Sequence, residues 1–93
     1  MTSIKKLKKE INSYIMELIS ECFTYKYFHH EEDDDKVNSI VADLVNLRNE
    51  LISRINNPDK ETKSKGKNAY YRKILDDLYE QSNKLMDKLA NNQ

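Results

Sequence analysis

The sequence has few of the residues that make turns, and almost no cysteine. It contains one glycine, one proline and one cysteine in 93 residues. All-β and α/β folds need many turns and glycine-bearing loops, so both are disfavoured. One cysteine cannot build the internal disulfide framework on which small secreted domains depend. We therefore expect residues 1–93 to form one small helical domain.

The chain also lacks an excess of charge of one sign and a long apolar run. Sixteen basic and sixteen acidic side chains give a formal net charge of zero, which argues against a protein that coats nucleic acid through bulk charge. No run approaches the roughly 20 apolar residues that span a bilayer. Glu10 and Glu17 interrupt the stretch in which a secretory signal would be apolar. We expect a cytoplasmic protein that does not bind a membrane.

Three stretches carry apolar residues at the three- and four-residue spacing of a helix face. They predict helices over about 3–28, 35–56 and 65–90. The second has an apolar stripe roughly 160° wide, which suits a helix wedged between two neighbours. Because the connections are short, neighbouring helices should be antiparallel. The predicted fold is all-α, an up-down-up antiparallel three-helix bundle. The alternative is a helical hairpin that assembles as a dimeric bundle.

Basic residues gather in two parts of the chain that this topology brings to one end. Lysines occupy the start of the first helix, and more basic residues run from Lys60 to Lys73. The acidic run 31–35 goes to the opposite end. Positive side chains at a helix N-terminus oppose the helix dipole, so their gathering there hints at an anionic partner. The candidate anion-binding residues are Lys5, Lys9, Lys63, Lys65, Lys67 and Arg72.

The basic segment 63–73 also contains two tyrosines. Lysines along phosphates and rings stacked on bases are typical of proteins that bind single-stranded nucleic acid. However, Tyr71 falls on the apolar stripe of its helix and Tyr70 at the margin, and the net charge is zero. A nucleic-acid- or anion-binding accessory protein is therefore the alternative function, not the favoured one.

The other side chains that could bind a metal ion or react with a substrate have structural explanations. Residues 29–35 include histidines and carboxylates, but they lack the alternating oxygen donors and the glycine of a calcium loop. An acidic loop that caps the next helix explains them. Cys22 lies at the centre of the first apolar stripe, which makes it a small core residue. We expect no catalytic residue, no metal site, no cofactor and no small-molecule substrate.

Aromatic side chains exceed the face that such a bundle can bury. On the wheel of the first helix, Phe23, Tyr27 and Phe28 fall outside the apolar stripe, and Tyr79 and Met86 lie at the outer edge of the third stripe. Clustered exposed aromatics and methionines mark partner surfaces. A bent or early-ending first helix would instead fold the rings over the end of the bundle. We predict a non-catalytic protein–protein interaction module, a homodimer or a binder of another protein, with these five residues as anchors.

Overall fold

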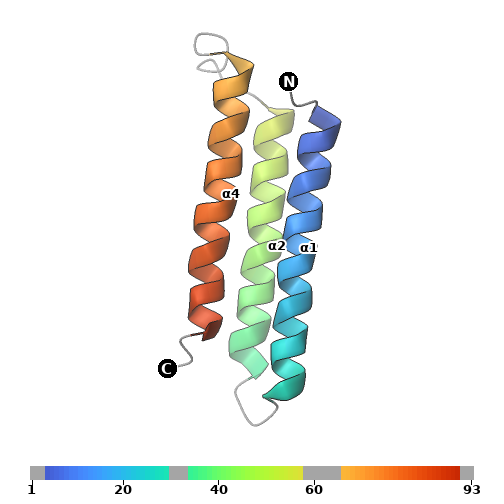
Figure 1. Cartoon of the computed structure of the whole chain (residues 1–93), viewed down its shortest axis with the longest axis vertical. Helices are drawn as coiled ribbons and strands as arrows, with labels where there is room; N and C mark the ends of the chain where they lie inside the picture. The colour runs from blue at the N-terminus through green and yellow to red at the C-terminus, as the bar shows by residue number, and fades with distance from the viewer. Residues whose placement is uncertain (1–3, 30–33, 58–65, 91–93) are drawn as a thin grey trace.

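The computed structural model describes residues 4–29, 34–57 and 66–90, which form three long helices (Figure 1). These are α1 (Ile4–Phe28), α2 (Asp34–Asn56) and α4 (Lys67–Ala90). Consecutive helices run in opposite directions, so that α1 and α4 begin at the same end. The predicted up-down-up three-helix bundle is confirmed. The alternative, a hairpin completed by a second chain, is wrong because α4 folds back along α2 and closes the core.

The core is built around α2, which lies between the other two helices and packs against both (Figure 1). Its buried residues occupy the centre of the wide apolar stripe that the sequence predicts. Val41 and Ile52 beside them are partly buried, and Val45 at the edge is 39% exposed. Side chains from all three helices form one hydrophobic cluster. The fully buried apolar members are Leu7, Ile11, Ile15, Cys22, Leu44, Leu51, Ile74 and Leu78. Burial of these side chains is the main force that holds the helices together.

Residues that favour the start of a helix stand where α2 and α4 begin. Asp34 and Asp35 occupy the first turn of α2, where negative charge complements the helix dipole. Gly66 directly precedes α4 with a φ of 90°, a conformation that side-chain-bearing residues rarely adopt. Its carbonyl oxygen accepts a hydrogen bond from the Tyr70 backbone N–H at 3.4 Å. The only glycine of the sequence thus stands where the backbone requires one.

The bundle is long and flat, with extents of 51 × 22 × 16 Å. At the lower end of Figure 1, α1 reaches further than α4. The last turns of α1 therefore lie beside the start of α2 but beyond the end of α4.

Replacing Leu44 with alanine tests the central position of α2. Leu44 is fully buried, whereas its neighbour Val45 is 39% exposed. We expect Leu44→Ala to lower the free energy of unfolding by about 2–5 kcal/mol, because it leaves a cavity in the core. Val45→Ala is the matched control and should change it by about 0.5 kcal/mol or less. Urea denaturation followed by circular dichroism measures both, and equal losses would contradict this burial pattern.

Candidate protein-binding surface

Three aromatic side chains are exposed together at the end of α1, and we call them the aromatic cluster: Phe23, Tyr27 and Phe28. Phe23 is 53% exposed, and Tyr27 and Phe28 are each 71% exposed. The rings of Tyr27 and Phe28 meet edge to face, with centroids 5.2 Å apart. Together with Ser20 and Thr24, the cluster lines a shallow hollow on the surface. α1 remains helical through Phe28, so the interpretation in which an early end folds the rings over the bundle is wrong.

The periodicity of α1 explains why these rings face away from the core. Cys22 in the same part of the helix is buried. Phe23 and Tyr27, one and five positions further along, are rotated from it by about 100° and about 140°, and Phe28 by about 120° in the opposite sense. The rings therefore emerge beside the core stripe. Full burial of a large apolar side chain contributes roughly 1.5–3 kcal/mol. A partner that covers the aromatic cluster would gain this free energy, which the isolated bundle forgoes.

Met16 extends the aromatic cluster along α1 towards its middle. It is 60% exposed, and it precedes Phe23 by seven residues and Tyr27 by eleven. This spacing puts the three side chains on one line along the helix. The sequence prediction omitted Met16, although the helical wheel that set Phe23 and Tyr27 apart would have found it. We call the line formed by Met16, Ser20, Phe23 and Tyr27 the outer face of α1.

Tyr79 and Met86 do not join the aromatic cluster. The Tyr79 side chain is 38% exposed, and its hydroxyl donates a hydrogen bond of 2.6 Å to Oε2 of Glu10. Its ring meets that of Tyr14 edge to face, with centroids 5.2 Å apart. Met86 is partly buried against the core. The structure thus brings three of the five predicted anchors together, whereas Tyr79 joins α4 to α1 and Met86 packs on the core.

The contact with Glu10 changes the acidity of Tyr79. The hydrogen bond to the carboxylate raises the pKa of the Tyr79 phenol to about 12, and partial burial and the negative charge of Glu10 act in the same direction. The neutral phenol is the form that donates this hydrogen bond. The contact between α1 and α4 therefore depends on a protonated Tyr79.

An absorbance titration of the tyrosines tests this contact. A phenol in the unfolded chain loses its proton near pH 10. Stability from the Tyr79 contact should therefore be fully present below about pH 10 and be lost as the pH rises through about 12. We expect Tyr79→Phe to remove a late-titrating phenol and Glu10→Gln to move that phenol to lower pH. If the late titration persists in Tyr79→Phe, another tyrosine is responsible and the contact is not formed.

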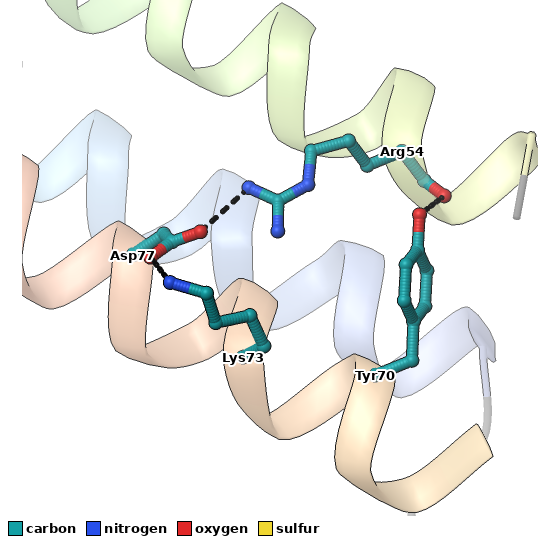
Figure 2. Close-up of polar contacts among 4 residues, drawn as sticks. All are labelled: Arg54, Tyr70, Lys73 and Asp77. Atoms are coloured by element: carbon teal, nitrogen blue, oxygen red, sulfur yellow. Dashed lines mark hydrogen bonds and ion pairs between the residues drawn. The ribbon is translucent and has the colours of Figure 1, made fainter. Parts of the chain in front are cut away.

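A polar network fastens α2 to α4 near the end where α4 begins (Figure 2). Nη1 of Arg54 and Nζ of Lys73 each donate to the carboxylate of Asp77 at 2.8 Å. The hydroxyl of Tyr70 donates to the backbone oxygen of Arg54, also at 2.8 Å. Burial acts to raise the pKa of Asp77, but the hydrogen bonds and charges of Lys73 and Arg54 outweigh burial and lower it. The network therefore favours an ionised Asp77.

Removing the charge of Asp77 tests the network, with its exposed neighbour Asp76 as the control. We expect Asp77→Asn to lower the free energy of unfolding at pH 7 by about 1–3 kcal/mol, since hydrogen bonds between charged groups are lost. A carboxyl group with a lowered pKa stabilises the fold above its unfolded pKa near 3.9, and this stability disappears as the pH falls through the folded value. The difference between wild type and Asp77→Asn should thus shrink below about pH 4. Asp76→Asn leaves the network intact and should change the free energy of unfolding at pH 7 by about 0.5 kcal/mol or less in parallel urea denaturations.

Three of the candidate anion-binding residues are described, and they lie at one end of the bundle. Lys5, Lys9 and Arg72 are exposed in the first two turns of α1 and α4, which begin at the same end (Figure 1). Lys63 and Lys65 lie outside the described residues, as does the side chain of Lys67. At the opposite end, the acidic run is described only from residue 34, where the exposed first turn of α2 begins.

The buried side chains that could act as nucleophiles, Cys22 and Ser82, have structural roles. The Cys22 thiol has no exposed surface, and burial, with a smaller contribution from Glu21, raises its pKa. The hydroxyl of buried Ser82 donates to the backbone oxygen of Tyr79 at 3.2 Å. Among the residues that the structure describes, no cluster of histidine, cysteine and carboxylate side chains could hold a metal ion. The described parts of the chain therefore present no assembled nucleophile or metal centre.

A second hollow follows the groove between α2 and α4. Its lining mixes both signs of charge and includes Glu50, Glu80, Lys84 and Lys88. Nζ of Lys84 lies 3.5 Å from Oε1 of Glu80. A ligand of either charge would meet repulsion as well as attraction there. The outer face of α1 is consequently the surface with the clearer binding chemistry.

Comparisons with known proteins give no match: no family model, no curated protein and no solved structure resembles the chain significantly. Within the described helices, none combines the length and the apolar character needed to cross a bilayer. The functional argument therefore rests on the geometry of the chain itself.

Proposed function

We propose that this protein is a non-catalytic protein–protein interaction module that self-associates through the aromatic cluster on α1. The observation that carries this proposal is the joint exposure of Phe23, Tyr27 and Phe28 on a regular helix. Large aromatic rings dominate the binding energy of many protein interfaces, because they bury much apolar area and have few side-chain torsions to order. The hollow that they line gives a partner's side chain a place to insert.

The placement of the remaining reactive groups supports a non-catalytic role. A nucleophilic thiolate needs access to a substrate and a lowered pKa, whereas Cys22 is buried and its pKa is raised. Its burial also fits the reducing cytoplasmic location that we propose from the presence of one cysteine. In this proposal, the chain acts by presenting a surface.

Binding of nucleic acid at the basic end receives less support. The side chain of Tyr71 is buried, and the hydroxyl of Tyr70 is held against the backbone of α2. Neither ring is presented as a platform on which a base could stack. Lys73 is also paired with Asp77, which reduces the positive charge available to a phosphate.

Light scattering at two protein concentrations tests self-association. We expect the wild type to shift towards a dimer at the higher concentration, and Phe23→Ser to reduce that shift, because the variant removes an apolar anchor. One lost ring of this kind should weaken association by about 1–4 kcal/mol, or roughly five- to a thousandfold.

Glu17→Ser is the matched control for this measurement. Glu17 is exposed on α1 and lies about 120° around the helix from Phe23. It shares a side of α1 with Phe28 but precedes it by eleven residues, or roughly 16 Å along the helix, so its replacement introduces the same serine outside the aromatic cluster. Circular dichroism verifies that both variants keep their helical content. If Phe23→Ser and Glu17→Ser associate as the wild type does, the aromatic cluster is not an interface.

A further inference from the structure

Towards the start of α1, the line of the outer face continues through Asn12, Lys9 and Lys5, and we include these residues in the outer face from here on. The outer face then has a sequence pattern that is symmetric about Met16. Lys5 and Tyr27 stand eleven residues before and after it, and Lys9 and Phe23 stand seven residues before and after it. Offsets of seven and eleven residues return a helix almost to the same direction. A basic half and an aromatic half therefore lie on one line, at equal distances from a central methionine.

The side chains that make up this pattern lie on the surface of the described bundle. The side chains of Lys5, Lys9 and Met16 are exposed, as are those of Phe23 and Tyr27. Ser20 and Asn12 stand four residues after and before Met16; Ser20 is exposed and Asn12 is partly buried. The side-chain oxygen of Asn12 accepts a hydrogen bond from Nε of Arg48. Asn12 and Ser20 are smaller than the lysine, methionine and aromatic side chains on either side of them, so they leave room for the side chains of a second helix.

Such a line complements itself when a second copy runs in the opposite direction. Met16 then meets Met16 on the two-fold axis, Lys9 meets Phe23 of the second copy, and Lys5 meets Tyr27 of the second copy. Lysine side chains pack their methylene groups on apolar surface and place the ammonium group near aromatic faces. In a two-fold interface each lysine–aromatic contact occurs twice, while the Met16–Met16 contact on the axis occurs once.

Charge at the ends of the bundle favours the same orientation. The positive start of α1 would approach the end of the second copy where α2 begins with Asp34 and Asp35, both exposed. A parallel pairing would instead place lysines beside lysines and acidic turns beside acidic turns. Attraction between unlike charged ends guides encounter and selects the register.

We infer that two copies of this chain pair antiparallel along the outer face of α1, with Met16 on the two-fold axis. This inference rests on the proposed self-association and adds its geometry. The occupant of the face is a second copy of the same chain. The aromatic half of each α1 is covered by the basic half of the other.

Disulfide trapping tests the geometry. In a Cys22→Ala background, Met16→Cys would place one thiol beside its symmetry mate, within the short range that a disulfide requires. We expect mild oxidation to link Met16→Cys chains about tenfold or more faster than chains carrying Glu17→Cys, which lies on another side of α1. Lys9→Cys should link to Phe23→Cys in a mixture but not to itself. Light scattering of the reduced samples measures association independently.

Each result separates the inference from the proposed function. Rapid linkage at Met16→Cys together with slow self-linkage of Lys9→Cys supports the antiparallel pair. Fast self-linkage of Lys9→Cys means a parallel pair, which overturns the inference and leaves self-association in place. A dimer in light scattering with no linkage at either position means a different interface and also overturns the inference. A monomer at both concentrations overturns the inference and the proposed function together.

The charge component has its own readout. Lys5→Glu would place a negative charge beside the acidic first turn of α2 in the second copy. We expect the dissociation constant of the dimer to rise by about two- to fivefold, with a smaller effect at high salt. An unchanged dissociation constant at low salt would overturn this part of the inference.

Discussion

Burial of α2 between two other helices is the constraint on which the rest of the structure depends. A helix with an apolar stripe this wide cannot bury the stripe against one neighbour, so both flanking helices must pack on α2. Leu44 and Leu51, with no exposed surface, mark the centre of that packing. Once α1 and α4 both lie on α2, the short connections make each of them antiparallel to α2. The positions of the basic and acidic ends are consequences of this arrangement.

Polar contacts then determine how the outer helices are rotated on α2. Arg54 and Asp77 join α2 to α4, while Tyr79 and Glu10 join α4 to α1. Both contacts lie at the edges of the core, where they are directional without requiring a fully buried charge. The flank of α1 that faces neither helix remains open, and it carries Met16, Phe23 and Tyr27. The core forms without this flank of α1, so its apolar side chains stay exposed in the single bundle.

Most of the fold could be predicted from the sequence because it depends on local periodicity. The stripes, the shortage of turn residues and the single Asn57-Pro58 break define the helices and their order. The candidate surface could be predicted in part, since the helical wheel separates Phe23 and Tyr27 from the core. The contacts of Tyr79 could not, because they depend on the relative rotation of helices far apart in the chain. The same limit applies to Arg54 with Asp77, whose pairing requires the register of α2 against α4.

The contact between Tyr79 and Glu10 also has a consequence for how the chain folds. These residues are 69 positions apart, whereas the α1–α2 and α2–α4 interfaces join helices that follow each other directly. Closing a longer loop loses more chain entropy, and topologies dominated by near neighbours fold quickly. The two hairpins should therefore assemble early, with the seam between α1 and α4 closing last. The same seam should open first when the native state fluctuates.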